Sequence, residues 1–319
     1  MGNTYASMRP VLFHIPLGFV SLPLYSYGLM LALSLIVGWY ITLGLCQRDG
    51  MDRVTMGRCY MWTAGSALAG ARLLYVFTNL DRFDNFLDIF KVWQGGLVAY
   101  GGFLGGFVGA WVFCRIKGIR LLAWADCAVP SLCTGLMITR MGCLLYGCDF
   151  GKPFDGKWSI VFPAGSPAFN QQRVEGLLPP SALHSLPVHP TQLYESLNGL
   201  VLLGLVFLVR RFRKFSGEMF VAFTMGYAIL RYYVEVLRAD EQRGNVGPLS
   251  TSQFIGVTTF MAGAALLAYL YSRYRKNPHA MQLWTDGQAL VAATPAPAAP
   301  SGPAKPSANA EKRRRKKRS

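Results

Sequence analysis

Charged side chains are scarce in this 319-residue sequence, at 15% of all residues, and acidic side chains are the scarcest. Only 16 aspartates and glutamates stand against 32 lysines and arginines, and there are only 4 histidines. Hydrophobic residues make up 52% of the chain, which is too apolar for a soluble domain of this length. The low charge content therefore argues against a soluble protein and predicts several membrane spans.

The shortage of acids leaves a formal net charge of +16, a value that also occurs in nucleic-acid-binding proteins. Much of the excess, however, lies in residues 312–318 and in short loops between apolar runs. Basic loops at the ends of spans are what the positive-inside rule produces. Membrane topology explains the charge better than a nucleic acid does, so no nucleic-acid partner is expected.

Processing signals and metal motifs are also missing. The first residues lack a basic region followed directly by an apolar core, so no cleavable signal peptide is expected. The 7 cysteines form no repeated CxxC pair, and His/Cys/Asp ligand spacing is absent, so neither a metal nor another cofactor is expected. Most cysteines lie inside apolar runs as small hydrophobes. Cys143 and Cys148 flank the end of one run, where a disulfide or a zinc pair stays open.

Apolar runs of membrane length are what the sequence does contain. About 20 apolar residues in a helix cross the roughly 30 Å hydrocarbon core of a bilayer. Seven such runs occur, at residues 25–45, 56–77, 95–113, 121–145, 188–209, 219–237 and 254–271. The third is rich in glycine, which allows either close helix contact or a re-entrant segment, and we favour close contact. The predicted fold is an all-α integral membrane protein with about seven transmembrane helices.

The remaining segments define the predicted domains. Residues 1–24, which contain three prolines, are expected to form an interfacial arm ahead of spans one to four in residues 25–145. Residues 146–187 contain no span-length apolar run and predict a small extramembrane insert, followed by spans five to seven in residues 188–272. Residues 273–319 are predicted to be a disordered tail whose basic cluster could touch anionic lipid.

Loop charge sets the predicted orientation. The loops after spans one, three, five and seven are basic, whereas those after spans two, four and six mix acids with bases. The positive-inside rule places the basic loops in the cytoplasm. Seven spans then put the N-terminus outside and the C-terminus in the cytoplasm, and the insert becomes periplasmic. Arg140, His189, Glu195 and Glu235 all fall toward the outer face.

Arg140 is the one charge near the end of the fourth apolar run. An arginine at the centre of a membrane helix costs about 2.5–3.5 kcal/mol on insertion scales, and less near an end. Arg140 lies about two turns before a glycine-rich turn in residues 146–153. Two interpretations stay open: the cation holds an anionic ligand at head-group level, or the side chain simply snorkels to the interface.

Arg231 and Glu235 are four residues apart on one face of the sixth predicted span, and Arg238 follows one turn later. They could form an ion pair that only lowers the insertion penalty. Alternatively, both arginines join Arg140 in an anion site, with Glu235 orienting one guanidinium. Arginine suits a phosphodiester because its planar fork donates two parallel hydrogen bonds. A phospholipid head group is the anion available at that depth.

Three further side chains are candidates with an equally plain structural explanation. His189, followed by a proline, is predicted to begin the fifth helix, where it could cap, pack, bind or shuttle protons. Tyr27 and Tyr100 stand where an interfacial aromatic belt would account for them.

Five segments taken together carry a stronger signal. They cover residues 26–30, 93–102, 140–151, 189–195 and 226–238. The His-Pro-Thr-Gln-Leu-Tyr-Glu segment and the Arg-x3-Glu-x2-Arg pattern are the most specific of them. In order and spacing the segments resemble the prolipoprotein diacylglyceryl transferase family of bacterial inner membranes. The resemblance runs across roughly residues 25–271 and leaves the tail outside.

The resemblance implies transfer of a diacylglyceryl group from phosphatidylglycerol to the lipobox cysteine of a prolipoprotein signal peptide, with release of glycerol phosphate. It implies that Arg140 binds the lipid phosphate. The other residues that match functional positions of the family are Tyr27, Gly151, Arg231, Glu235 and Arg238. The expected partners are therefore phosphatidylglycerol, the prolipoprotein and membrane lipid.

The sequence departs from the family pattern at two places. Cys143 and Tyr146 stand where asparagines are frequent, and Tyr100 stands where some members carry a histidine proposed as a base. The chain could use another proton acceptor, the histidine could be dispensable, or the chain could be a paralogue with altered activity. An anion transporter that uses the same arginines and a paralogue that binds lipid without chemistry are the rival functions.

The residues by themselves also fit such a transfer. A thiol with a pKa of about 8.5 needs only modest help to ionise, because nearby cations favour the thiolate. The larger task is to stabilise the departing phosphate, which arginines in a water-poor site can do. Candidates for proton handling are Tyr100, His189 and Glu195, and Gln192 and Glu195 are candidates for substrate binding.

Overall fold

A computed structural model describes residues 4–5, 8–17, 20–83, 85–90, 95–239, 244–278, 281 and 283. Most of these residues are helical, which confirms the all-α prediction. The long helices are α1 (Ser26–Arg48), α2 (Arg53–Thr78), α3 (Ala99–Lys117), α4 (Leu121–Tyr146), α6 (Thr191–Phe212), α7 (Glu218–Leu237) and α8 (Thr251–Lys276). The helix α5 (Pro167–Val174) is short.

Six of the long helices are long and apolar enough to cross a membrane, and α2 is the exception among them. It coincides with the second predicted span, but its 26 residues include three arginines and many small residues. These residues lower the mean hydropathy of α2, although the helix is long enough to span a membrane. By length and composition, the described residues thus contain six candidate spans rather than the seven expected.

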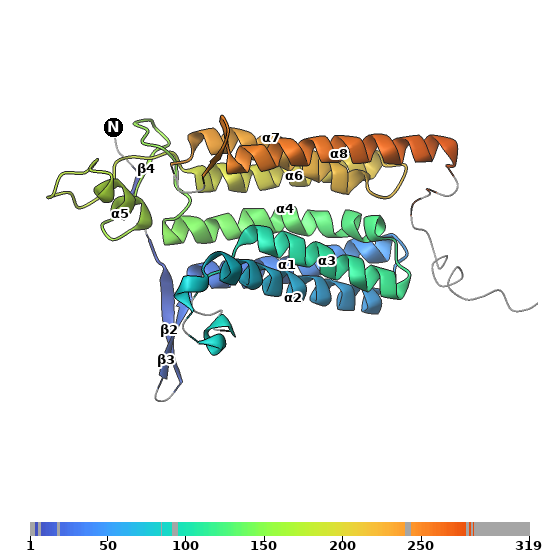
Figure 1. The fold of residues 1–319 in the computed structure, drawn as a ribbon, viewed down its shortest axis with the longest axis horizontal. Coiled ribbons are helices and arrows are strands. Elements are labelled where there is room, and N and C mark those ends of the chain that lie inside the picture. The colour runs from blue at the N-terminus through green and yellow to red at the C-terminus, as the bar shows by residue number, and fades with distance from the viewer. Residues whose placement is uncertain are drawn as a thin grey trace, which may run out of the picture. The chain divides into compact units, whose positions relative to one another are not determined.

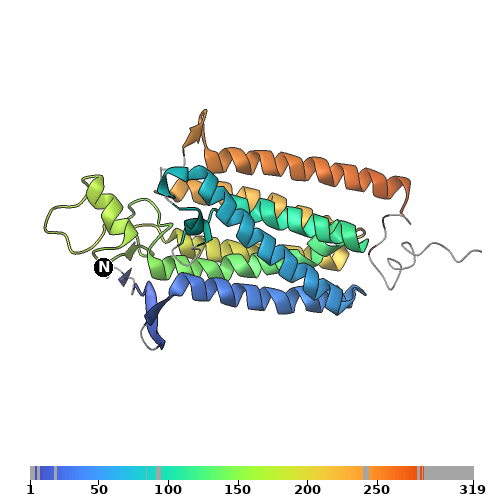
Figure 2. The same ribbon diagram turned by 60° about the horizontal axis from the view of Figure 1, so that its bottom comes forward.

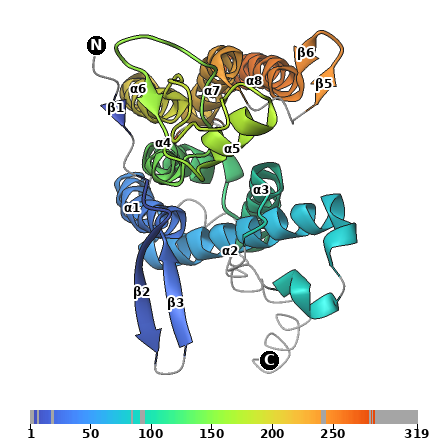
Figure 3. The same cartoon turned by 90° about the vertical axis from the view of Figure 1, so that its left-hand side faces the viewer.

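The helix α4 lies between two groups of helices (Figures 1 and 3). On one side α1 contacts α4, and α2 packs along α3; on the other side α6 contacts both α4 and α7, and α8 packs on α7. Figure 2 shows α8 at the edge of its group. Among the candidate spans, α4 is the most buried and α8 the least. The sequence stretch with Arg140 is therefore the central element of the bundle.

Glycines set the close approach of α2 to α3. A methyl group at Gly101 would overlap the carbonyl oxygen of Gly70, and one at Gly105 would overlap that of Ser66. Only glycine permits backbones to approach this closely. The glycine-rich run is thus a regular packed helix from Ala99 onward, as favoured above. Gly95 and Gly96 precede it, with φ of 89° and 78°.

Arg72 fixes the connection between α2 and α3. Its guanidinium donates to the carbonyls of Asp88 at 2.8 Å, Ile89 at 2.7 Å, Gly95 at 2.7 Å and Gly96 at 3.0 Å. The connection contains two short 3₁₀ helices, η1 (Leu80–Arg82) and η2 (Phe86–Phe90). A buried arginine thus finds its partners in backbone carbonyls.

Short strands lie outside the helices and were not predicted. In the N-terminal arm, β2 (Val11–Leu17) and β3 (Val20–Tyr25) form an antiparallel hairpin that leads into α1 (Figure 1). Nearby, β1 (Thr4–Tyr5) pairs in parallel with β4 (Ile160–Val161). A small hairpin of β5 (Asn245–Val246) and β6 (Leu249–Ser250) precedes α8.

Two predicted boundaries were wrong. The fifth predicted helix begins at Thr191 rather than Val188, because Val188 forms isolated β-bridges with Pro153 and Ile160 and Pro190 is the N-cap. The helix α8 continues to Lys276, so residues 273–276 belong to it and not to a disordered tail. The basic cluster at residues 312–318 lies outside the described residues.

An ionic cluster joins the ends of four helices near the start of α4. Asp49, just after α1, accepts hydrogen bonds from Arg210 at 2.6 Å and Arg213 at 2.6 Å. Asp126 on α4 accepts the backbone N–H groups of Gly217 at 2.8 Å and Phe220 at 3.0 Å, so it caps α7 from another helix. The basic ends of α1 and α6 thus meet at one end of the bundle.

Candidate functional site

The opposite end of α4 carries the candidate site. The helix stops at Gly147, whose φ of 82° is the left-handed conformation that favours glycine. The N–H groups of Gly147 and Cys148 both donate to the carbonyl of Cys143, at 2.8 and 3.2 Å. This helix ending turns the chain back across the start of α6.

The segment after the turn threads between two other helix ends. Gly151 N–H donates to the His189 carbonyl at 3.0 Å, and Lys152 N–H donates to the Leu237 carbonyl at 2.8 Å. A Cβ atom at Gly151 would lie 2.8 Å from both of those carbonyl oxygens. Glycine is therefore needed here because the backbones at the start of α6 and the end of α7 come too close for a side chain.

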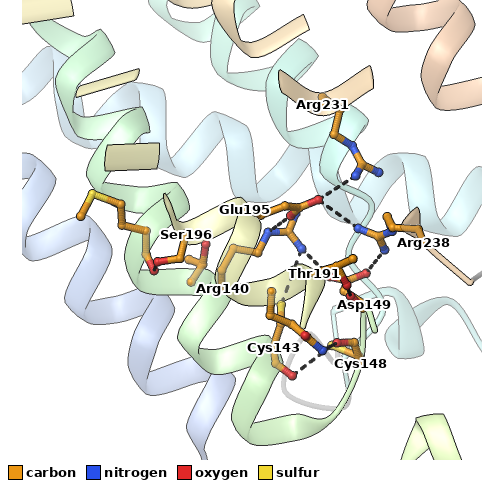
Figure 4. A network of polar contacts seen from close by, with 12 residues as sticks. Arg140, Cys143, Cys148, Asp149, Thr191, Glu195, Ser196, Arg231 and Arg238 are labelled. Carbon is orange, nitrogen blue, oxygen red and sulfur yellow. Dashed lines mark hydrogen bonds and ion pairs between the residues drawn. The ribbon is translucent and has the colours of Figure 1, made fainter. Parts of the chain in front are cut away.

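Glu195 on α6 is the centre of the charged network (Figure 4). Its Oε1 atom lies 2.6 Å from Nη1 of Arg231 and 3.2 Å from Nη1 of Arg238. Its Oε2 atom forms an ion pair with Nε of Arg140. The three arginines named from the sequence thus meet, and they meet on Glu195.

Asp149 is a second bridge, and sequence reasoning missed it. Its Oδ2 atom pairs with Arg140 and its Oδ1 atom with Arg238. Asp149 has a φ of 57°, which is uncommon for a residue with a side chain, and Thr191 Oγ1 donates to its carbonyl at 2.5 Å. The available signal was that Asp149 is the only acid between Arg140 and Gly151.

Glu235 completes the network. It pairs with Arg231 at 2.8 Å, the neighbour four residues earlier that the sequence indicated, and Ser250 Oγ donates to it at 3.2 Å. Three arginines therefore face three carboxylates. Their side chains are at most 20% exposed, and the most exposed is Asp149. Buried charges in a membrane helix are expensive unless paired, so such a cluster marks a candidate functional site.

Gln192 and His189 lie beside the network rather than within it. The buried Gln192 side chain donates to the Cys148 carbonyl at 2.6 Å and so holds the turn. The His189 ring stacks on Phe154 with centroids 3.9 Å apart, and its Nδ1 lies 3.3 Å from the Tyr194 hydroxyl. Burial lowers the pKa of His189 below its ordinary value, which favours the neutral imidazole. Because α6 begins at Thr191, His189 precedes the helix instead of beginning it. Its described side-chain contacts are with the aromatic residues Phe154 and Tyr194.

The two candidate tyrosines lie on different helices and are similarly exposed, at 42% for Tyr27 and 46% for Tyr100. Tyr27, in the first turn of α1, packs against α4 where a Cβ atom at Gly142 would lie 3.1 Å from the Tyr27 Cα. Its hydroxyl is within electrostatic range of Arg140 and Asp149. Tyr100 lies in the first turn of α3.

Tyr227 on α7 is a third tyrosine near the charged network. It lies one turn before Arg231, within electrostatic range of that residue, of Arg140 and of Tyr100. Tyr227 lies in the 226–238 segment that carries part of the family resemblance, but it was not among the candidates from the sequence. Trp93 and Gln94, from another of these segments, lie outside the described residues.

Cys143, Cys148 and Asp149 form a group of potential metal ligands. Their sulfur and carboxylate oxygen atoms all lie within 4.8 Å of one another. The sequence left a zinc pair open at the two cysteines, and the helix ending adds Asp149 to them. Both Asp149 oxygens, however, already pair with guanidinium groups, which leaves a poor ligand set for a cation.

Comparisons with known proteins agree on one family. A family model described as prolipoprotein diacylglyceryl transferase matches residues 10–269. The chain is 30% identical over 270 residues to the phosphatidylglycerol–prolipoprotein diacylglyceryl transferase of Clostridium tetani, across 85% of this chain and 100% of the relative. It is 31% identical over 251 residues to the Gloeobacter violaceus protein of the same name, across 77% of this chain and 88% of the relative.

Proposed function

Because the chain belongs to the prolipoprotein diacylglyceryl transferase family, we propose that it transfers the diacylglyceryl group of phosphatidylglycerol to the cysteine thiol of a prolipoprotein. The observation that carries the proposal is the meeting of Arg140, Arg231 and Arg238 on Glu195. The relatives compared above are named as this transferase. The arginine network supplies the cations that such a reaction needs.

Asp149 marks the proposed place of the lipid phosphate. Its two oxygens bridge Arg140 and Arg238, as the two non-bridging oxygens of a phosphodiester would. Guanidinium groups suit both anions because each donates in a planar fork. Asp149 is the most exposed member of the network, so it is the member that an incoming phosphate can displace.

The transfer breaks one bond and forms another. The thiolate of the prolipoprotein cysteine attacks the glyceryl carbon that bears the phosphate, a carbon–sulfur bond forms, and the carbon–oxygen bond to phosphate breaks. Glycerol phosphate leaves with the bonding electron pair, and the thiol proton goes to a base or to water. Arg140 and Arg238 stabilise the charge on the departing phosphate because they are already oriented in a largely buried site.

Glu195 orients the arginines in this proposal. Both of its oxygens are engaged by guanidinium groups, so it is poorly placed to accept the thiol proton. Glu235 holds Arg231 from the other side at 2.8 Å. Tyr27 and Tyr227 lie within electrostatic range of Arg140, and Tyr100 lies within range of Tyr227. The described side-chain contacts of His189 are instead with Phe154 and Tyr194.

We further propose a bacterial inner-membrane protein with seven spans, α2 included. The 26 residues of α2 extend about 39 Å, enough to cross the bilayer, and the helix packs along α3. Arg210 and Arg213 meet Asp49 at the end of the bundle that also carries the basic loops. That end would face the cytoplasm. The network, the N-terminal arm and the insert at residues 146–187 would then face the periplasm, with the C-terminal tail inside.

The test is a reconstituted transfer. Purified full-length protein is incubated with phosphatidylglycerol and a lipobox peptide, and mass spectrometry is used to detect the diacylglyceryl adduct on cysteine. A peptide with serine in place of that cysteine serves as the control and should remain unmodified. If lipid and peptide both bind and no adduct forms, the chain is a non-catalytic relative. Anion flux into proteoliposomes without a thioether product would indicate a transporter.

A further inference from the structure

Cys143 and Cys148 lie together at the edge of the arginine network. Their sulfur atoms are within 4.8 Å of each other, and Nη1 of Arg140 is 3.8 Å from Cys143 Sγ. Cys143 is 4% exposed, whereas Cys148 is half-buried and lies beyond the end of α4. One thiol is thus within reach of a reagent, and the other lies behind it.

The backbone builds this pair. Gly147 and Cys148 both donate their N–H groups to the Cys143 carbonyl, a helix ending that brings the side chains on either side of the glycine together. Gln192 donates to the Cys148 carbonyl at 2.6 Å and holds that residue in place. Backbone hydrogen bonds therefore hold the two cysteines as neighbours.

A dithiol explains this arrangement better than a metal site does. The third potential ligand, Asp149, already pairs with Arg140 and Arg238 through both oxygens. Two guanidinium charges beside it disfavour a cation. The same guanidinium charges do not oppose a disulfide between the two sulfur atoms, because a disulfide carries no charge.

We propose that Cys143 and Cys148 are a redox-active dithiol that a disulfide oxidant, such as oxidised glutathione, converts to an intramolecular disulfide. The Cys148 thiolate attacks one sulfur of the oxidant and releases one thiol, which leaves a mixed disulfide on Cys148. The Cys143 thiolate then attacks Cys148 Sγ and releases the second thiol. The protein loses two electrons and two protons, and the oxidant becomes two thiols.

The disulfide would act on the proposed transfer through Asp149. It would tie Cys148 to the last turn of α4 and so restrain Asp149, the next residue, between Arg140 and Arg238. A restrained Asp149 keeps the place of the phosphate filled. This consequence rests on the proposed function, whereas the disulfide itself does not.

The first test needs no activity. The full-length protein in detergent is treated with oxidised glutathione, free thiols are alkylated after denaturation, and peptides are mapped by mass. We expect the peptide that holds both residues to be lighter by two hydrogens and to resist alkylation until it is reduced. A stable glutathione adduct on Cys148, or unmodified thiols, would overturn the proposal. So would protection from alkylation that requires added Zn²⁺ and no oxidant.

Cys59 and Cys114 provide an internal control. These two thiols also lie close enough to interact, but they are 0% and 1% exposed. We expect this pair to stay reduced under the same treatment. Equal oxidation of both pairs would show that the surroundings of Cys148 confer no selectivity, and the proposal would fail.

The second test compares transfer rates before and after oxidation. Wild-type transfer should fall at least about fivefold on oxidation and recover with a reductant, a factor that corresponds to about 1 kcal/mol. Cys148→Ser, which lacks the attacking thiol, should keep its own rate, whatever that is, unchanged by the oxidant, whereas Cys143→Ser should trap the glutathione adduct on Cys148. Disulfide formation without any change in rate would overturn the link to Asp149. Disulfide formation in a protein without transfer would instead refute the proposed function alone.

Discussion

The guanidinium of Arg140 on α4 pairs through Nε with Oε2 of Glu195 on α6. The sequence indicated both residues as candidates, but it did not pair them. Their contact joins the central helix to the helix that follows the insert. Glu195 also pairs with Arg231 in α7 and with Arg238, the C-cap of that helix. One carboxylate therefore sets the spacing of three guanidinium groups.

Replacement of Glu195 tests that role. Glu195→Gln leaves three buried guanidinium groups with one carboxylate fewer, and removal of one partner of a buried pair costs about 3–5 kcal/mol. We expect a lower thermal midpoint in detergent and little transfer. Glu175→Gln, an exposed position at the end of α5, is the control and should change neither quantity. Wild-type stability and transfer in Glu195→Gln would contradict the central role of this carboxylate.

Replacement of Arg140 by lysine tests the fork geometry. Arg140 reaches Asp149 through Nη1 and Glu195 through Nε, whereas lysine has a single nitrogen. We expect transfer to fall by about 10²–10³-fold, as when one charge-stabilising donor is lost. Initial rates of adduct formation would measure the effect. Arg211→Lys, exposed near the end of α6, should transfer at the wild-type rate. A fully active Arg140→Lys would show that a point charge is enough.

A methyl group at Gly151 tests the crowded backbone crossing. In Gly151→Ala the new Cβ would meet the His189 and Leu237 carbonyl oxygens at 2.8 Å, so the backbone must shift. Such overpacking costs about 1–3 kcal/mol, and here it also displaces Asp149. Thermal unfolding and transfer should both decline. Gly135→Ala, on α4 with nothing within 4 Å of its Cβ, should unfold at or above the wild-type temperature. Equal behaviour of the two variants would refute the steric argument.

The far end of the bundle predicts a pH dependence of stability. Burial acts to raise the pKa of Asp49, but hydrogen bonds from Arg210 and Arg213 outweigh it and hold the pKa below its ordinary value of 3.8. Because the pKa of Asp49 is lower in the folded state, ionised Asp49 stabilises the folded state at pH values above the ordinary pKa. This contribution is lost as the pH falls through the folded-state pKa. Asp49→Asn should unfold at a lower temperature than wild type near neutral pH. The two melting curves should converge in acid, and a constant gap at all pH values would contradict the assignment.

Much of the chain could be predicted because the membrane simplifies the problem. A bilayer demands long apolar helices, so the lengths of the apolar runs locate α1, α4 and α7 within a few residues. Glycine density indicated the tight packing of α3. The N-terminal hairpin escaped prediction because its pairing depends on contacts between strands rather than on a pattern in one segment.

The partners in the site could not be predicted in the same way. The i,i+4 spacing indicated the contact of Arg231 with Glu235, because a helix fixes that neighbour locally. Asp149 gave no periodic signal, and its position depends on the turn at Gly147 and on Thr191 from another helix. Cys143 and Cys148 did stand out, because they flank the end of an apolar run, but their spacing left a disulfide and a zinc pair equally open.

The sequence by itself determined the class of protein, the positions of its helices and the family resemblance, because apolar length and local spacing are properties of the chain alone. Only the tertiary structure decided that Glu195 and Asp149, rather than Glu235 alone, hold the three arginines. Ion pairs between helices depend on which faces meet in the bundle, and no single segment encodes that choice.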